Sequence, residues 1–213
     1  MEDNYRHKGM RRKLIEQLAG KGIKNKAVLA AFDAVPRHFF LDLAFINQAY
    51  SNTAFQIGAG QTISHPYTVG FQTELLKIEK GQKVLEIGTG SGFQTAILCE
   101  LGARVISIER QRELYLSAKE RIKNLKYNPK LFYGDGYKGQ PAYAPYDRVL
   151  VTCGAPTVPE TLLDQLKENG ILVIPIGKDG KQIMTKYKKI NGDFETTTYG
   201  DFSFVPMLER TAK

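Results

Sequence analysis

The sequence predicts an α/β fold with a doubly wound, mostly parallel sheet, an N-terminal helical extension and a C-terminal antiparallel edge. Residues 1–80 carry apolar side chains at helical spacing, whereas residues 81–177 alternate short apolar strands with helices. Residues 178–213 are rich in β-branched and aromatic side chains, which favour strands. Repeated β-α-β units imply parallel strands with helices on both faces. Since 213 residues suit one domain, we expect residues 1–213 to form a single unit from these three parts.

The first part is expected to be helical, with helices over residues 10–18, 27–35 and 66–78. Asn25 is a suitable N-cap for the second helix, and Pro36 ends it. Pro66 fits the first turn of the third helix. The intervening residues 56–64 are rich in Gly and Thr and are expected to form a loop.

The second part predicts five strands, over residues 84–87, 104–108, 130–133, 146–152 and 170–176. The helices between them are expected over residues 93–101, 111–124 and 159–166. In the tail, two further strand-like segments are separated by Asn191-Gly192-Asp193, which is a hairpin signal. We therefore expect the tail to add an antiparallel hairpin to one edge of the sheet.

The strongest local motif follows the first predicted strand and opens a helix, and it reads Glu86-Ile87-Gly88-Thr89-Gly90-Ser91-Gly92. Its glycines Gly88, Gly90 and Gly92 allow a sharp turn and the close approach of a ligand to the main chain. The spacing is GxGxG, which departs from the GxGxxG of dinucleotide sites. A carboxylate at Glu86 disfavours a pyrophosphate but suits a ligand with a sulfonium and an ammonium group. The motif therefore indicates a Rossmann-like site for S-adenosyl-L-methionine rather than NAD.

Two more acidic residues follow the next predicted strands. Glu109 ends the second strand, about 20 residues after the first glycine of the motif, where a carboxylate can accept hydrogen bonds from both ribose hydroxyls. Asp135 follows the third strand and could accept from an adenine amino group, with Gly136 leaving room for the ring. Either residue alone could be a surface carboxylate or a helix cap. Together with the glycine motif they mark the carboxyl edge of the sheet, where α/β proteins bind ligands.

Composition narrows the choice of partners. The net charge of +8 could indicate nucleic acid, but Lys and Arg are spread along the chain without a basic tail, so we expect no nucleic-acid partner. No apolar run approaches the roughly 20 residues that span a membrane, and no leader-type stretch opens the chain. Cys99 and Cys153 form no CxxC pair, and no metal site is expected. We expect a cytoplasmic monomer.

A second set of motifs extends over nearly the whole chain. The segment Gly60-Gln61-Thr62-Ile63-Ser64-His65-Pro66 is similar to the GQTIS-x-P signature of the protein-L-isoaspartate O-methyltransferase family. Further matches to this family, in its order, are Val35-Pro36-Arg37, the glycine motif, Gly134-Asp135-Gly136, Ala155-Pro156, Val158-Pro159 and Phe204-Val205-Pro206. The resemblance implies a single catalytic domain with the S-adenosylmethionine-dependent methyltransferase fold, in which residues 1–80 supply the active-site loop.

The family resemblance assigns the substrate end. It implies that Ser64 is the active-site hydroxyl, that Thr62 and Ile63 contact the substrate, and that the strand end at Val205 and Pro206 contacts the extended peptide. The implied partners are damaged proteins containing L-isoaspartyl, and by extension D-aspartyl, residues. A rival interpretation is that Ser64 caps the helix that begins at Pro66. Asn52 stands where family members often have an acidic residue, which leaves no charge-based role for that position.

The implied nucleophile is the α-carboxylate of the isoaspartyl residue, which is ionised at neutral pH and needs no general base. His65 is therefore not assigned as a base. A nucleic-acid methyltransferase is the rival enzyme class. Enzymes that methylate the adenine amino group usually have an Asp/Asn-Pro-Pro-Tyr/Phe motif, and enzymes that methylate cytosine C5 need a Pro-Cys pair. Residues 152–156 read Thr-Cys-Gly-Ala-Pro and match neither. A cofactor-binding protein without catalysis is disfavoured by the intact Ser64 loop.

Overall fold

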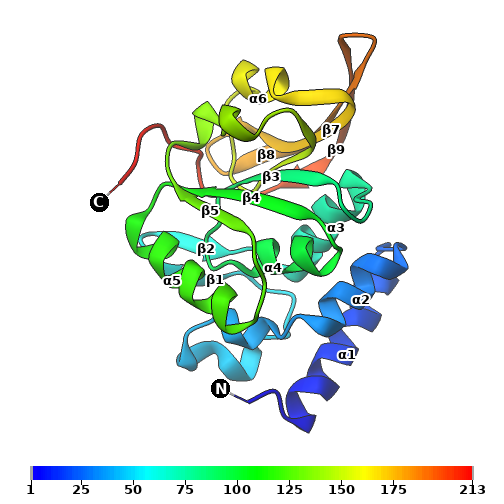
Figure 1. Ribbon diagram of the computed structural model, residues 1–213. Helices are drawn as coiled ribbons and strands as arrows, with labels where there is room; N and C mark the ends of the chain where they lie inside the picture. The colour runs from blue at the N-terminus through cyan, green and yellow to red at the C-terminus, as the bar shows by residue number, and fades with distance from the viewer. Residues whose placement is uncertain (1, 213) are drawn as a thin grey trace.

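A computed structural model of the chain describes residues 2–212 and contains one large sheet (Figure 1). The strand order is β5-β4-β3-β6-β7-β8-β9. The strands are β3 (Lys83–Ile87), β4 (Arg104–Glu109), β5 (Lys130–Tyr133), β6 (Tyr146–Val151), β7 (Leu166–Lys178), β8 (Lys181–Ile190) and β9 (Asp193–Phe202). The first five are parallel, and β8 and β9 are antiparallel additions. This arrangement confirms the predicted Rossmann-like α/β class with an antiparallel edge.

Helices cover both faces of the sheet because side chains alternate along each strand. On one face Val84 and Leu150 pack with the helices α3 (Pro66–Leu76) and α4 (Phe93–Glu100). On the other face Leu85 and Val149 pack with the short helix α6 (Glu160–Asp164). Helix α5 (Arg112–Asn124) follows β4 and contacts β4 and β5. The predicted helices of the core are therefore present.

The first two helices of the N-terminal extension pack on the sheet through α3 and α4. They are α1 (Tyr5–Gly20) and α2 (Lys26–Ala34), whose buried faces share a core with Val69 of α3 and Phe93 of α4. Asn25 caps α2 as expected, since its side-chain oxygen accepts from the amide nitrogens of Ala27 and Val28. Short 3₁₀ turns, η1 (Arg37–Phe40) and η2 (Leu43–Gln48), lead from α2 towards the site.

Three predicted elements were wrong in detail. The segment expected as a loop over residues 56–64 forms a small antiparallel hairpin of β1 (Phe55–Gly58) and β2 (Gln61–Ile63). Its tight turn uses positive φ angles at Gly58, Ala59 and Gly60, and the flanking Phe55 and Ile63 are buried in the first core. Strand β7 begins at Leu166 rather than at residue 170. A bulge between Leu166 and Ile171 lets the residues on either side of it pair with β6. Helix α6 is correspondingly shorter than expected.

The C-terminal segment returns from β9 to the carboxyl edge of the sheet. The Gly154 amide donates to the Val205 carbonyl (2.8 Å), and the Met207 amide donates to the Gly154 carbonyl (2.7 Å). These bonds hold residues 205–207 beside the loop that follows β6. The tail beyond them is tied to the loop after β4, where the Ala212 amide donates to the Arg110 carbonyl at 2.8 Å. No helix within residues 2–212 has the length and apolar character that crossing a bilayer requires.

Candidate active site

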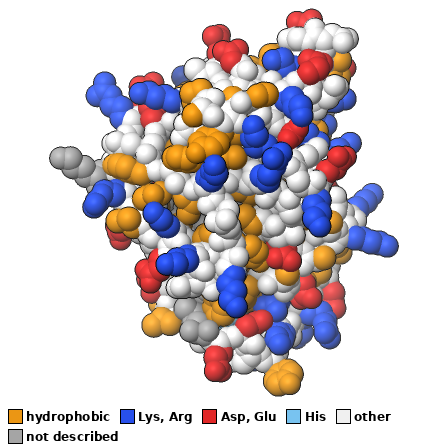
Figure 2. Space-filling view, in the orientation of Figure 1, with side chains coloured by type: hydrophobic (Ala, Val, Ile, Leu, Met, Phe, Trp, Pro, Cys, Tyr) orange, Lys and Arg blue, Asp and Glu red, His pale blue; other side chains and the backbone are white. Residues whose placement is uncertain are grey.

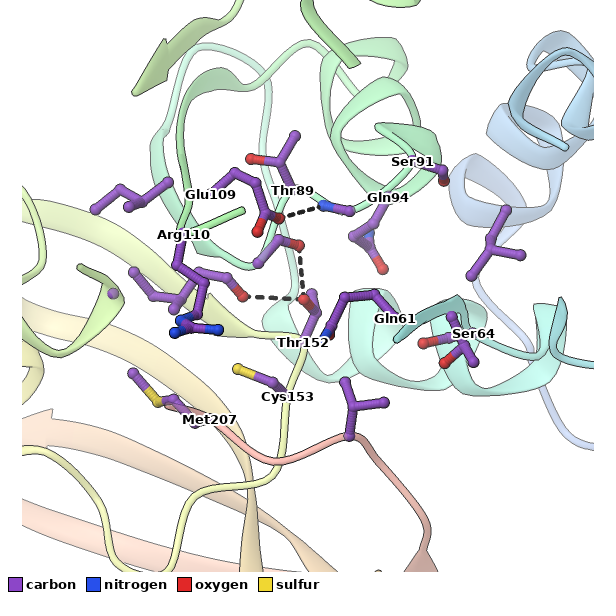
Figure 3. A pocket seen from close by; sticks show the side chains of 18 of the residues that line it. Gln61, Ser64, Thr89, Ser91, Gln94, Glu109, Arg110, Thr152, Cys153 and Met207 are labelled. Atoms are coloured by element: carbon purple, nitrogen blue, oxygen red, sulfur yellow. Dashed lines mark hydrogen bonds between the residues drawn. The ribbon is translucent and has the colours of Figure 1, made fainter. Parts of the chain in front are cut away.

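A cavity lies at the carboxyl ends of β3, β4 and β6, and the sequence-predicted residues divide around it (Figure 3). Nine of them line it: Thr62, Ile63, Ser64, Gly88, Gly90, Glu109, Gly136, Val205 and Pro206. Three others, Glu86, Gly92 and Asp135, are not part of its wall. In Figure 3 Glu109 and Arg110 lie on the side of the cavity away from Ser64. The cavity therefore has a glycine-loop end and a hairpin end.

Each of the three glycines in the glycine loop has different surroundings, so a side chain would have a different effect at each. All three have positive φ angles. At Gly88 a Cβ would collide with the hydroxyl of Thr152, which donates to the Ile87 and Gly88 carbonyls. At Gly90 a Cβ would approach only Ile57, at 3.5 Å, so the main chain there is open to the cavity. At Gly92 a Cβ would press on Ile122 of α5, so this glycine serves helix packing rather than ligand contact.

The Glu109 carboxylate holds the loop in place. Its Oε2 accepts from the Gly90 amide, and its Oε1 accepts from the Gln111 amide, both at 2.8 Å. The side chain is buried, and this burial raises the pKa of Glu109 while the backbone hydrogen bonds oppose the shift. Each carboxylate oxygen can accept more than one hydrogen bond, so Glu109 retains capacity for hydroxyl donors in the cavity.

Glu86 lies behind the loop and is completely buried. Its Oε2 accepts a short hydrogen bond (2.5 Å) from the Thr95 hydroxyl, while its Oε1 has no partner among the residues that the structure describes. Burial raises the pKa of Glu86 to about 8, against the lowering effect of the Thr95 and Ser107 hydroxyls. The Ser107 hydroxyl in turn lies 2.6 Å from that of Thr89, which lines the cavity. Glu86 is thus linked to the cavity through side chains and does not face it.

Asp135 and Gly136 are separated by the structure although they are adjacent in sequence. The Asp135 carboxylate accepts from the Tyr137 amide and, through its other oxygen, from the Arg210 amide, both at 3.0 Å. It therefore joins β5 to the C-terminal tail. Gly136 lines the cavity, where a Cβ would collide with Ile87 and approach Met207 at 3.4 Å. The missing side chain leaves a flat apolar wall there, as a planar ring would need.

The hairpin end presents the Ser64 hydroxyl. Helix α3 begins at Pro66, and His65 occupies its N-cap position. The His65 side chain makes no capping hydrogen bond. Instead the Asn52 side-chain oxygen accepts from the Tyr67 amide at 2.8 Å. The helix is therefore capped by Asn52, and Ser64 does not have the capping role of the rival interpretation. Ser64 is half-buried, and no described residue forms a hydrogen bond with its hydroxyl.

A buried arginine supports this loop from behind. Arg37 is 1% exposed, and its Nη2 donates to the carbonyls of Ser64 (3.0 Å) and Thr53 (3.1 Å). Its guanidinium lies 5.0 Å from the centre of the Phe93 ring. Its Nε and Nη1 atoms have no hydrogen-bond partner within residues 2–212, and burial lowers the pKa of Arg37 to about 9, so the group stays charged at neutral pH. A buried cation without a counter-ion favours an anion close by.

Neither nearby titratable side chain suits a base or a nucleophile. Burial and the charge of Arg37 lower the pKa of His65, but His65 does not line the cavity and is therefore not placed to act as a base. Cys153 does line the cavity, but burial raises the pKa of its thiol to about 12. Because the thiolate is the reactive form, Cys153 is inert at neutral pH.

Sequence reasoning missed Gln94. Its Nε2 donates to the Thr73 hydroxyl at 3.0 Å, while its buried Oε1 has no partner in the described part of the chain, and the residue lines the cavity. An unpartnered buried amide oxygen is suited to an ammonium donor. The signal in the sequence was weak, because a glutamine in the first turn of a helix is unremarkable. Together with Glu109 and Gly136, this acceptor makes the cavity fit a ligand with an amino-acid end, two vicinal hydroxyls and a planar ring.

The fold and the site define a Rossmann-like α/β protein of the methyltransferase class. A family model described as "Protein-L-isoaspartate(D-aspartate) O-methyltransferase (PCMT)" matches residues 9–212. A protein-L-isoaspartate O-methyltransferase of Christiangramia forsetii is 55% identical over 210 residues, covering 98% of this chain and 99% of that protein. The chain therefore belongs to the protein-L-isoaspartate(D-aspartate) O-methyltransferase family.

Solved structures agree with this assignment. A protein-L-isoaspartate O-methyltransferase superposes with a TM-score of 0.84 at 30% identity, and the match covers 92% of this chain but 65% of that longer chain. A candidate protein-L-isoaspartate O-methyltransferase from Plasmodium falciparum, in complex with S-adenosyl-L-homocysteine, superposes with a TM-score of 0.81 at 26% identity. That match covers 93% of this chain and 98% of the other.

Proposed function

We propose that the chain transfers the methyl group of S-adenosyl-L-methionine to the free α-carboxylate of L-isoaspartyl residues, and to D-aspartyl residues, in damaged proteins. The observation that supports it most directly is the pairing, in one cavity, of the glycine-loop end with the free Ser64 hydroxyl. Family membership supplies the substrate class. We also propose that the enzyme is a monomer, with residues 1–213 as a single catalytic domain.

At the glycine-loop end, we assign four contacts to the cofactor. Glu109 accepts from the ribose hydroxyls, Gly136 leaves room for the adenine ring, and the Gly88 and Gly90 main chain approaches the ligand closely. Gln94 Oε1 accepts from the α-ammonium group. Glu86, Gly92 and Asp135 act indirectly, by holding the loop, α4 and the C-terminal tail that surround these contacts. When bound, S-adenosyl-L-methionine supplies an electrophilic sulfonium methyl group.

At the hairpin end, Ser64 donates a hydrogen bond to the substrate carboxylate and orients one of its oxygens towards the methyl carbon. The uncompensated charge of Arg37, which supports Ser64 through its carbonyl, stabilises the arriving anion. Thr62 and Ile63 form the wall on this side, and Val205 and Pro206 lie beside the peptide main chain. Because the carboxylate is already ionised, with a pKa near 3.5, no protein base is needed.

In the transfer step a carbon–oxygen bond forms as the carbon–sulfur bond breaks, and the opposite charges of the reactants cancel. Alignment and exclusion of water are the main tasks of such a site. The methyl ester product contains a good leaving group beside the next peptide nitrogen. Attack by that nitrogen expels methanol and gives a succinimide, whose hydrolysis returns part of the material to normal aspartate.

The test uses two peptides of one sequence, containing either L-isoaspartate or L-aspartate, with methyl-labelled cofactor. We expect base-labile label on the isoaspartyl peptide only, because the additional backbone methylene leaves its α-carboxylate free. Equal labelling of both peptides would reject the proposal. Label that resists base would indicate transfer to nitrogen or carbon and would reject it too.

A further inference from the structure

A second depression adjoins the hairpin end of the cavity. It has a volume of about 490 Å³, within the range of about 300–1,000 Å³ that is common for ligand sites. One wall comes from the first turns of α3 and the other from the end of β9 and the residues just after it. We name it the α3–β9 groove. None of the residues assigned to cofactor contact lines it.

The floor of the α3–β9 groove is aromatic. Phe71 lies at its centre, with ring centroids 5.8 Å from Tyr67, 5.7 Å from Tyr199 and 5.3 Å from Phe202. All four rings are half-buried, so each keeps part of its surface open. The rim is polar and includes His65 and Asp201, which are exposed. An apolar floor with a polar rim suits a large apolar side chain whose main chain stays hydrated.

The groove and the cavity meet at both walls. His65, in the groove, directly follows Ser64, which lines the cavity. On the opposite wall Ser203 lies in the groove two residues before Val205, which again lines the cavity. An extended chain advances at most about 3.3–3.6 Å per residue. A polypeptide whose isoaspartyl carboxylate reaches Ser64 can therefore enter the groove within one or two residues.

The edge of the sheet also favours a polypeptide as the occupant. Strand β9 is the terminal strand of the order β5-β4-β3-β6-β7-β8-β9, so one row of its backbone groups has no partner strand among residues 2–212. Extended peptides pair with such edges independently of their sequence. An enzyme that acts on many damaged proteins needs recognition of this kind.

We propose that the α3–β9 groove binds the polypeptide flanking the isoaspartyl residue and accepts an aromatic or large aliphatic side chain about two residues from it. This proposal rests on the proposed function. It assigns to the groove a preference for substrates with apolar flanks, at the same catalytic centre.

Gly200 provides a clean test of the groove. It lines the groove, is exposed, and a Cβ on it would meet no other atom within 4 Å. Its φ is outside the left-handed region, so Gly200→Leu should fold normally while its side chain fills the groove. Gly9→Leu is the matched control, because Gly9 is equally open but lies on α1, away from both sites. Thermal unfolding of both variants checks that they are folded.

The substrates are two isoaspartyl peptides that differ at the positions two residues before and two residues after the isoaspartyl residue. One peptide has phenylalanine at both positions and the other has glycine. We expect wild type and Gly9→Leu to show about tenfold higher kcat/KM for the phenylalanine peptide, since partial burial of one ring gives an effect of this size. In Gly200→Leu this ratio should fall to about one. Equal kcat/KM values for the two peptides in wild type would overturn the groove proposal but not the proposed function. The same holds if Gly200→Leu keeps the preference for the phenylalanine peptide. Failure of wild type to methylate either peptide would overturn the proposed function as well.

Discussion

The glycine-loop end and the hairpin end of the cavity hold their polar groups in opposite ways. At the glycine-loop end the Glu109 carboxylate is fixed by two backbone amides, and each glycine has a defined backbone constraint. At the hairpin end neither the Ser64 hydroxyl nor the Nε and Nη1 atoms of the nearby Arg37 have a partner among the described residues. The first end is organised before its ligand arrives. The second has hydrogen-bonding capacity that a carboxylate would satisfy.

The surroundings of the two ends differ as well. Lys and Arg are distributed over the face seen in Figure 2, where they alternate with Asp and Glu instead of forming a single basic stripe. The net charge of +8 therefore marks no single site on that face. The charge that bears on the substrate is local and buried, at Arg37. Substitutions at the two ends should separate cofactor binding from turnover.

The largest effect is expected at the glycine loop. Gly90→Val places a branched side chain at a φ of 54° and in the path of the ligand, so cofactor binding should become undetectable by isothermal titration. Gly81→Val is the control, since Gly81 also has a positive φ but lies at an open position just before β3, at the end of that strand opposite the cavity. Near-normal affinity in folded Gly90→Val would mean that the ligand lies elsewhere.

The hairpin end should show the opposite pattern. Ser64→Ala should reduce kcat/KM for an isoaspartyl peptide by about tenfold to a thousandfold, because a misaligned carboxylate loses positional advantage. Its affinity for S-adenosyl-L-homocysteine should hardly change. Ser117→Ala, a half-buried serine on α5, serves as the control. Full activity in Ser64→Ala would remove this hydroxyl from the mechanism.

A smaller and purely binding effect is expected for Glu109→Gln. Loss of one charged acceptor should weaken cofactor binding by about 1.5–3 kcal/mol, the range for hydrogen bonds to charged groups. Turnover at saturating cofactor should change little, since the ribose does not react. Titration calorimetry together with steady-state kinetics distinguishes the two effects. A large fall in kcat at unchanged affinity would contradict the ribose assignment.

The smallest effect concerns Glu86 and pH. Because its pKa is raised to about 8 in the folded protein, the folded state holds a proton that the unfolded state releases near pH 4.5. Stability from this group is therefore lost as the pH rises towards 8. In ligand-free protein, Glu86→Gln should lose less thermal stability than wild type between pH 6 and pH 9. The exposed Glu120→Gln is the control, and equal losses in wild type and Glu86→Gln would contradict the assignment.

The two ends of the cavity also differ in how much of their structure the sequence could predict. Glu109 was recognisable because a strand and a glycine motif set its position along the sheet. Asp135 was predicted by the same reasoning to face the ligand, but it does not line the cavity, and its carboxylate accepts from the Tyr137 and Arg210 amides. Arg210 is 75 residues away in sequence, so only tertiary structure brings it there. A rule based on strand ends cannot account for such a contact.

At the hairpin end, the residues alone favoured a helix-capping role for Ser64, and only the family resemblance favoured an active-site role. The capping residue proved to be Asn52, 15 residues before Tyr67, and local spacing could not have identified it. The family resemblance assigned Ser64 to the active site, but it gave no role to Arg37, which lies behind Ser64, and it did not predict the hairpin that presents Ser64. These features depend on packing of the N-terminal extension against α4, which periodicity predicts only as helices.

The most direct test of the account is a crystal structure of the protein with S-adenosyl-L-homocysteine and an isoaspartyl peptide. We expect the homocysteine ligand at the glycine loop, with its ribose hydroxyls on Glu109. The peptide α-carboxylate should accept a hydrogen bond from Ser64 and point an oxygen at the sulfur, with room between them for one methyl group. A carboxylate bound away from Ser64, or a ligand that does not contact Glu109, would contradict the account.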